Sequence, residues 1–333
     1  MRTDGMNGDS ALPVVIVAGL EPGRLAVVGA AATAAAGELA LGVVRSGMAA
    51  PDLDVALLAL ADEEVVVCAS EPCLCCAQRL DLVRVVGKLA ARGNRPDLLV
   101  VEADADTDLA LMAQTMLRDP DLRRHTELQG IVVVVDAVGL ALGLDMHGIL
   151  NLPDSWCDQL AMADVVVLRN IDRLNPSAQE RLLWALGGLA PRSATVAGSR
   201  RHQGRAVLDV DGFGTSRLGS RVIAPRAHRA LPADSEPRTV VIEIEGWLEV
   251  HRLSSWIDDL HAQLGADLLR LDGVLAIDGE RRRWVARGAR TTLDLQDGAT
   301  WDHDEVPRSS LALVGRRIEA GALGDTLVDC LAS

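Results

Sequence analysis

Residues 12–24 read LPVVIVAGLEPGR: an uncharged apolar run, a turn bounded by Gly19 and Gly23, and then Arg24. The apolar run predicts a buried strand, and the Ala-rich stretch after the turn predicts a helix over residues 24–40. In an α/β chain this order marks the place of a phosphate-binding loop, because the N–H groups at a helix N-terminus attract anions. The segment therefore predicts the edge of a sheet where a ligand would bind.

The turn departs from a complete phosphate loop in its chemistry. Such a loop has four residues between its glycines, followed by Lys and then Ser or Thr. Here three residues separate Gly19 from Gly23, and Arg24 and Leu25 follow. Arg24 offers a cation to a phosphate, but Leu25 has no hydroxyl with which to hold Mg²⁺. The residues alone therefore predict a weakened phosphate site.

Further apolar runs and helical periods alternate along the first part of the chain. Buried strands are predicted over residues 98–101, 131–135 and 165–168, and helices over residues 80–93 and 180–189. Continuous aliphatic strands separated by helices indicate a mostly parallel sheet covered on both faces, with its ligands at the carboxyl ends of the strands. Glu102, Asp136 and Asp172 fall at such ends.

The length of 333 residues suits two domains. Residues 1–11 are predicted to be disordered, and residues 12–197 to form the α/β domain. Residues 198–238, rich in Arg, Gly, Pro and Ala, are predicted to be a linker. Residues 239–333 combine an alternating strand, a helical period over 253–264, three more strands and a final helix, which predicts a smaller α+β domain.

A second stretch, residues 68–76, reads CASEPCLCC. Cys73, Cys75 and Cys76 are close enough in the chain to turn toward one soft metal ion, and thiolates bind Zn²⁺ strongly. Cys68, Glu71 or a residue of another protein chain could supply a fourth ligand. The alternative is that these are buried cysteines without a metal.

The six cysteines are spaced wrongly for a disulfide framework, because neighbouring cysteines rarely reach pairing geometry. Thiolate ligands in a reducing compartment fit this spacing better. Cys157 and Cys330, isolated in helical contexts, are predicted to pack in the core.

The formal charge of −14 argues against nucleic acid and anionic membranes as partners, because an acidic surface repels both. No segment reaches the roughly 18 uninterrupted apolar residues of a membrane helix. We therefore expect a cytoplasmic protein that does not bind membranes or nucleic acid.

With these segments in order, the chain resembles the CobW family of P-loop GTPases, a group of metallochaperones and metal-insertion proteins. The central match covers residues 63–93, where an acidic pair and a short strand precede the cysteines and a helix follows Asp81-Leu82. Pro72 stands where the family has glycine. Further matching segments are residues 113–115, 119–122, 130–137, 159–164 and 267–276.

The resemblance implies a P-loop NTPase-like domain that binds GTP and Mg²⁺, followed by a CobW-type C-terminal domain that helps to choose the client. It also implies a site for Zn²⁺ or Co²⁺ at Cys73, Cys75 and Cys76. A client metalloprotein or a regulated protein is the expected partner, and a homo-oligomer stays open.

On the nucleotide side, the residues that match the family pattern have changed. The family's phosphate loop falls on Gly19, Gly23 and Arg24, without its Lys and hydroxyl. Glu102 keeps the carboxylate of the segment near the γ-phosphate, and only Asp172 remains of the pattern that reads guanine. Without the lysine and the hydroxyl, the charge of the transferred phosphoryl group is stabilised less, which predicts impaired GTPase chemistry and makes the binding of GTP and Mg²⁺ doubtful. The sequence indicates no catalytic residue.

Three functions follow from this pattern. The first is a Zn²⁺ or Co²⁺ chaperone or sensor with a degenerate GTPase site. The second is a non-enzymatic scaffold or recruitment factor on the same fold, for example in a metal-starvation response. The third is an active GTPase whose rearranged phosphate loop uses Arg24.

Overall fold

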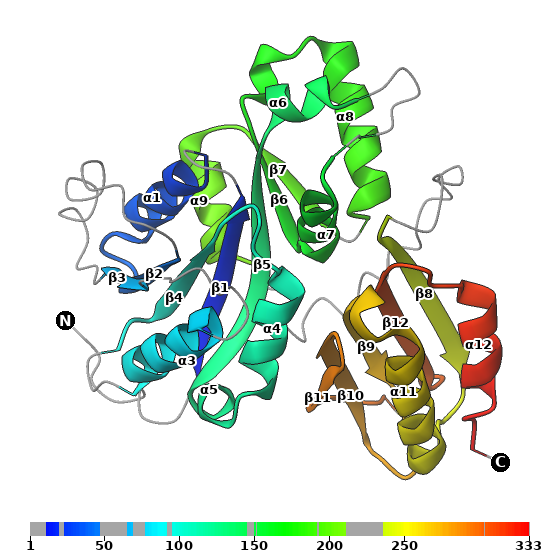
Figure 1. The fold of residues 1–333 in the computed structure, drawn as a ribbon. Coiled ribbons are helices and arrows are strands. Elements are labelled where there is room, and N and C mark those ends of the chain that lie inside the picture. Colours follow the sequence, from blue (N-terminus) through cyan, green and yellow to red (C-terminus); the bar gives the residue numbers. More distant parts are fainter. Residues whose placement is uncertain are drawn as a thin grey trace.

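The computed structural model describes residues 11–19, 23–46, 65–68, 77–91, 95–144, 150, 152–191, 193–210, 236–302 and 304–332. These residues form two domains that lie side by side (Figure 1). Residues 1–10, which belong to the segment predicted to be disordered, lie outside the described residues. Among the helices of the described part, none is long and apolar enough to cross a membrane.

The first domain is built on a parallel sheet that has seven strands within the described residues, in the order β3-β2-β4-β1-β5-β6-β7. The strands are β1 (Leu12–Gly19), β2 (Leu41–Ser46), β3 (Val65–Cys68), β4 (Leu98–Ala103), β5 (Thr126–Asp136), β6 (Val165–Arg169) and β7 (Ala194–Ala197). The aliphatic residues of β1, β4, β5 and β6 are buried because helices cover both faces of the sheet. The predicted P-loop NTPase-like sheet is confirmed.

Alternate residues of the strands enter two separate cores. On one face Val15 and Val17 of β1 pack with α1 (Gly23–Ala35) and α9 (Arg200–Leu208). On the other face Val14 and Ile16 belong to the core that includes several other helices. These are α3 (Ala77–Ala90), α4 (Leu109–Arg118), α5 (Pro120–His125), α6 (Ala137–Leu142), α7 (Asp154–Met162) and α8 (Pro176–Leu189).

Helix α9 corrects the prediction that the linker starts at residue 198. Ser199 caps the helix by accepting a hydrogen bond from the N–H of His202, and Val207 is fully buried. Gly204 lies directly on α1, since a Cβ at this position would come within 2.4 Å of the carbonyl oxygen of Ala30. The start of the predicted linker is therefore part of the first domain, and its short arginine-rich helix was too polar to be recognised.

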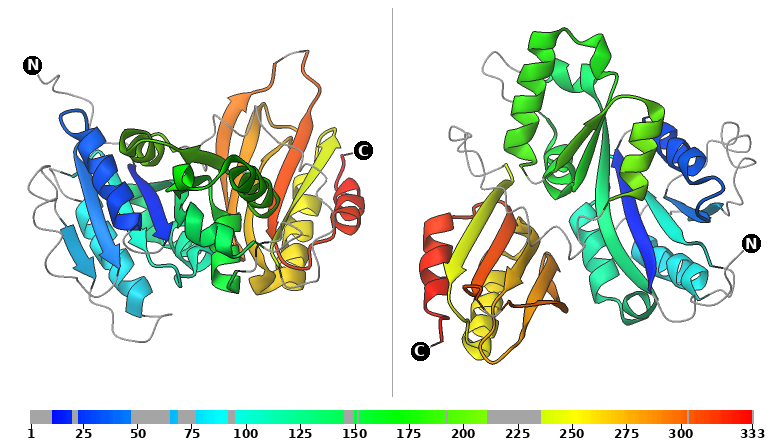
Figure 2. Two further views of the ribbon diagram at one scale, coloured as in Figure 1. Left: turned by 90° about the horizontal axis from the view of Figure 1, so that it is seen from above. Right: turned by 180° about the vertical axis from the view of Figure 1, so that it is seen from behind.

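The second domain is an antiparallel sheet with the strand order β11-β10-β9-β12-β8. Its elements are β8 (Arg238–Glu245), α11 (Val250–Leu264), β9 (Leu268–Leu275), β10 (Arg282–Ala289), β11 (Thr292–Thr300), β12 (Arg308–Gly315) and α12 (Ala320–Val328). Figure 2 shows α12 at the outer edge of the molecule, beside β8. The predicted α+β domain is confirmed, with β11 as an additional strand.

Side chains of the second sheet also complete the core of the first domain. Leu269, Ala289 and Val314 belong to the same buried cluster as the strands and helices of the first domain. Other residues of the sheet pack under α11 and α12, so β9 is buried along its whole length. The two domains therefore share a continuous apolar contact.

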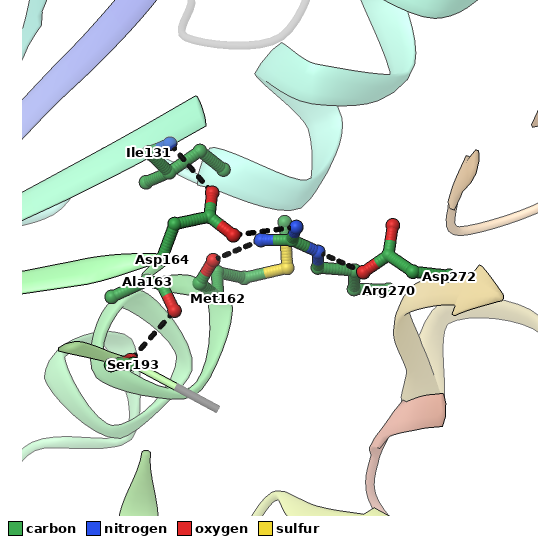
Figure 3. Close-up of polar contacts among 7 residues, drawn as sticks. All are labelled: Ile131, Met162, Ala163, Asp164, Ser193, Arg270 and Asp272. Carbon is green, nitrogen blue, oxygen red and sulfur yellow. Dashed lines mark hydrogen bonds and ion pairs between the residues drawn. The ribbon is translucent and has the colours of Figure 1, made fainter. Parts of the chain in front are cut away.

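A buried arginine stands at the centre of this contact (Figure 3). Arg270 of β9, which is 2% exposed, donates 2.7 Å and 2.5 Å hydrogen bonds to Asp164 and Asp272, and a 2.8 Å bond to the carbonyl oxygen of Met162. Asp164 in turn accepts a 2.8 Å bond from the N–H of Ile131. Burial lowers the pKa of Arg270, but Asp164 and Asp272 outweigh this effect and raise it above its ordinary value.

Further polar pairs join the same two domains. They are Arg316 with Asp158 at 2.6 Å, Arg123 with Asp294 at 2.5 Å, Arg287 with Glu127 at 3.3 Å, and Arg290 with Asp108. Two segments that resemble the family, residues 159–164 and 267–276, thus meet at the domain interface.

Candidate functional site

The carboxyl ends of β1, β5 and β6 meet helices α6 and α7 around a cavity of about 480 Å³. In Figure 1 this edge of the sheet lies toward the top, where α6 follows β5. The lining residues are Gly19, Gly23, Ala105, Val133, Val134, Val135, Asp136, Gly139, Leu140, Trp156, Gln159, Leu160, Arg169, Asn170 and Arg173. The predicted ligand edge thus has a cavity, and both glycines of the turn line it.

Gly19 ends β1 in a conformation that only glycine adopts readily, with φ at +132°. A Cβ at this position would lie 2.2 Å from the carbonyl oxygen of Val134 on the neighbouring strand β5. The close approach explains why a glycine stands at the start of the predicted phosphate loop. Gly23, at the start of α1, lines the same cavity.

The side chain of Arg24 points into the protein and is 1% exposed. Its Nη1 donates to the carbonyl oxygens of Gly19 at 2.9 Å and Ala103 at 3.0 Å. The same nitrogen lies 2.6 Å from Asp104 Oδ1, and Nε lies 3.6 Å from Glu102 Oε2. Arg24 therefore joins the first turn of α1 to the ends of β1 and β4.

The two carboxylates that pair with Arg24 differ in their exposure. Glu102 is 1% exposed, whereas the side chain of Asp104 is 49% exposed. Glu102 was predicted as a cofactor-binding residue, and the structure places it against Arg24, beside the loop. Neither Arg24 nor Glu102 is among the residues that line the cavity.

Asp136 ends β5 and caps helix α6. Its Oδ1 accepts hydrogen bonds from the N–H groups of Val138 and Gly139, and its Oδ2 accepts one from Asn170. Burial raises the pKa of Asp136, but these bonds and the charge of Arg169 hold it below its usual range. Asp136 is therefore an ionised cap whose oxygens already have protein donors.

The end of β6 brings two arginines to the cavity. Asn170 has a left-handed backbone at φ +58°, a conformation that asparagine tolerates, and Arg169 and Arg173 line the cavity on either side of this turn. Nη1 of Arg169 would lie 3.4 Å from a Cβ at Gly23, so its guanidinium group lies close to the start of α1.

Asp172, the residue expected to bind guanine, lies away from the cavity. It is exposed in a short 3₁₀ turn, Ile171–Arg173, and does not line the cavity. The structure brings Gly19 and Gly23 together at the cavity and Arg24 and Glu102 together at the ends of β1 and β4, and it leaves Asp172 outside both groups.

The residues of this site that were not predicted from the sequence include Asp104, Trp156, Gln159, Arg169 and Arg173. Gln159 is 3% exposed and donates hydrogen bonds of 2.8 Å and 3.0 Å to the carbonyl oxygens of Asp104 and Thr107. Its only signal was its place in a segment that resembles the family. Helix α7 reaches the cavity through Trp156 and Gln159, and it reaches the second domain through Asp158.

The predicted metal ligands Cys73, Cys75 and Cys76 lie outside the described residues. Within the described part, no group of three or more His, Cys, Asp or Glu side chains could hold a metal ion. Cys157 and Cys330 are buried and unpaired, which confirms the prediction that they pack in the core. Burial raises the pKa of the Cys157 thiol to about 12, so this thiol stays protonated at neutral pH.

Comparisons with known proteins match both domains. Residues 15–196 match the CobW/HypB/UreG nucleotide-binding domain, and residues 238–331 match the cobalamin synthesis protein cobW C-terminal domain. Zinc chaperone CobW of Sinorhizobium sp. is 23% identical over 267 residues, which cover 73% of this chain and 74% of that protein. Zinc chaperone YjiA of Escherichia coli (strain K12) is 25% identical over 252 residues, which cover 73% and 75%.

The crystal structure of Zn(II)-bound YjiA GTPase from E. coli has the same fold. It aligns with a TM-score of 0.71 at 18% identity, and the alignment covers 97% of this chain and 100% of that one. The resemblance to the CobW family is therefore confirmed by both domains, in chain order. This chain belongs to the CobW/HypB/UreG family and carries the cobW C-terminal domain after the nucleotide-binding domain.

Proposed function

We propose that this protein is a cytoplasmic metal-binding chaperone or sensor of the family, specific for Zn²⁺ or Co²⁺, in which the nucleotide switch is impaired. Membership of the family and the likeness to two zinc chaperones support the metal-binding part. Cys73, Cys75 and Cys76 would hold the ion as cargo for a client metalloprotein. An incomplete shell of three thiolates suits transfer better than storage.

The single observation that supports the impaired switch is the environment of Arg24. In a working phosphate loop the lysine at this place reaches the β- and γ-phosphates, and the next hydroxyl holds Mg²⁺. Here the guanidinium group points to Glu102, Asp104 and two carbonyl oxygens, and Leu25 follows. These residues do not fit a Mg²⁺–triphosphate group held in the usual way.

Energetics favour the inward position of Arg24. Turning its side chain toward a phosphate would separate it from the buried Glu102, and breaking a buried ion pair costs about 3–5 kcal/mol. Glu102 and Asp104 would also repel the phosphate. Nucleotide hydrolysis would then lack the cation that stabilises the transferred phosphoryl group.

The nucleotide part of the proposal is tested by calorimetry and by phosphate release with GTP and Mg²⁺. We expect no Mg²⁺-dependent binding and no hydrolysis above the uncatalysed rate. Tight, Mg²⁺-dependent GTP binding with turnover would contradict the impaired switch and would support an active GTPase with a rearranged loop.

The metal part is tested by titrating the apo-protein with Zn²⁺ and Co²⁺, with and without GTP, and by following the thiolate charge-transfer band of Co²⁺. Replacing Cys73, Cys75 and Cys76 with serine should abolish the band and the tight binding of Zn²⁺. Cys330→Ser is the matched control, because this cysteine is buried in the second domain. If the triple variant binds Zn²⁺ as tightly as the wild type, the scaffold function becomes the better explanation.

A further inference from the structure

The cavity at the ends of β1, β5 and β6 has the size and the wall of a small-molecule site. Its volume of about 480 Å³ falls within the roughly 300–1,000 Å³ of such sites. Most of the wall is apolar and consists of three valines of β5 together with Leu140 and Leu160. Trp156 adds an aromatic surface on which a planar ring can stack.

The charges that line this cavity favour an anion, although the protein as a whole is acidic. The charged lining residues are Arg169, Arg173 and Asp136, so two cations face one carboxylate. Asp136 already accepts hydrogen bonds from Val138, Gly139 and Asn170. Among the described residues, neither arginine has its guanidinium group occupied by a hydrogen bond or an ion pair.

The position of Arg24 sets this cavity apart from an ordinary phosphate loop. The guanidinium group of Arg24 already donates to the carbonyl oxygens of Gly19 and Ala103. Arg169, at the end of β6, lies close to Gly23 instead. The cations that a ligand would meet therefore come from the end of β6, and none of these groups is a ligand for Mg²⁺. Two guanidinium groups match the charge of one phosphate monoester, since each can donate two parallel hydrogen bonds to phosphate oxygens.

We propose that this cavity binds a nucleoside monophosphate without Mg²⁺, with the base on Trp156 and the phosphate between Arg169 and Arg173. The ligand is bound and not hydrolysed. This inference rests on the proposed loss of the nucleotide switch, because a working loop would take a triphosphate with its metal ion. A triphosphate carries more negative charge than the two arginines neutralise, and Asp104 and Glu102 lie close to the loop.

The experiment is calorimetric titration of the full-length protein with GMP and AMP in EDTA, repeated with Mg²⁺ in place of EDTA. The variants are Arg173→Gln and Trp156→Leu, and Arg181→Gln is the control, because Arg181 is an exposed arginine of α8 outside the cavity. We expect GMP or AMP to bind equally well with and without Mg²⁺. Loss of the charged hydrogen bonds in Arg173→Gln should weaken binding about tenfold or more.

Trp156→Leu should also weaken binding, and Arg181→Gln should leave it unchanged. The inference is overturned if neither monophosphate binds, if Mg²⁺ is required, or if Arg173→Gln binds as tightly as the wild type. This experiment does not measure the hydrolysis of GTP. A protein that hydrolyses GTP would contradict the proposed function, whereas a protein that fails to bind GMP and AMP would contradict only the present inference.

Discussion

Arg24 and Arg270 are both buried arginines that bind two carboxylates and at least one backbone carbonyl oxygen, yet they stabilise different parts of the molecule. Arg24 joins groups within the first domain, at the ligand edge of its sheet. Arg270 stands on β9 of the second domain and joins it to Asp164 and Met162 of the first.

The two sites also differ in their access to water. Both partners of Arg270 are almost fully buried, with side-chain exposures of 9% for Asp164 and 1% for Asp272. Asp104, one of the partners of Arg24, is half exposed. The comparison shows that the same chemistry can join a helix to two strand ends in one place and hold two domains together in another, and burial is expected to decide how much stability its loss costs.

Replacing Arg270 with Met should have the largest effect on stability. The substitution leaves Asp164 and Asp272 as buried charges without their cation, so we expect a loss of about 3–5 kcal/mol in the free energy of unfolding. Urea denaturation measures this loss. Arg308→Met is the control, because Arg308 and Glu245 form an exposed pair on the same sheet, and its loss should stay below about 1 kcal/mol. Equal losses in the two variants would contradict the role of Arg270.

Replacing Arg24 with Met should have a smaller effect, about 2–3 kcal/mol, because water can solvate Asp104 after the cation is lost. The buried Glu102 would lose the neighbouring charge of Arg24. The double variant Arg24→Met/Glu102→Gln should therefore recover part of the loss, since it removes the buried carboxylate charge. Urea denaturation of the three proteins measures the effect, and a double variant less stable than the single one would contradict this account.

Gln159 allows a test of the link between the two regions. It lies on α7, whose end supplies the carbonyl oxygen of Met162 to Arg270, and it donates to the carbonyl oxygen of Asp104, the partner of Arg24. Gln159→Leu removes the side-chain donor of the Thr107 carbonyl oxygen, whereas the carbonyl oxygen of Asp104 still accepts a 3.0 Å hydrogen bond from the N–H of Thr107, so a loss of about 1 kcal/mol is expected. Because Asp104 is shared, the losses in Gln159→Leu and Arg24→Met should not add. Strict additivity in a double-mutant cycle would show that α7 and the loop are independent.

The sequence was sufficient to predict β1, β4, β5 and β6, because their continuous aliphatic runs are typical of a covered parallel sheet, whereas β2 and β7 were not predicted. Glu102 and Asp136 were correctly placed at strand ends for the same reason. Strand β11 was missed although Leu293 and Leu295 alternate with Asp294 and Gln296, because this alternation is short and the rest of the strand is polar or small. Its position is set by pairing with β10.

The orientation of buried charged side chains could not be predicted in the same way. Arg24 reads as a cation for a ligand, yet its inward position depends on the end of β4, 79 residues away at Ala103. Arg270 depends on Asp164, 106 residues away. The orientation of each arginine side chain depends on partners that only folding brings close. No local sequence pattern at either arginine predicts that orientation. Trp156 on α7 and Arg173 in the turn after β6 were also missed, and both line the cavity in the folded chain.

Replacing Asp136 should have the smallest effect on stability. Hydrogen bonds hold this carboxylate, whereas a buried arginine holds the carboxylates discussed above. The pKa of Asp136 lies below the ordinary value of 3.8, so it contributes stability above that pH and loses this contribution as the pH falls through the lowered pKa. Asp136→Asn keeps a side-chain acceptor for the cap of α6, and because this residue is exposed we expect a loss below about 1 kcal/mol at neutral pH. The stability difference from the wild type, measured by urea denaturation at pH 7, 5 and 3, should shrink toward the acid end. A difference that stays constant over this range would show that the charge of Asp136 contributes nothing.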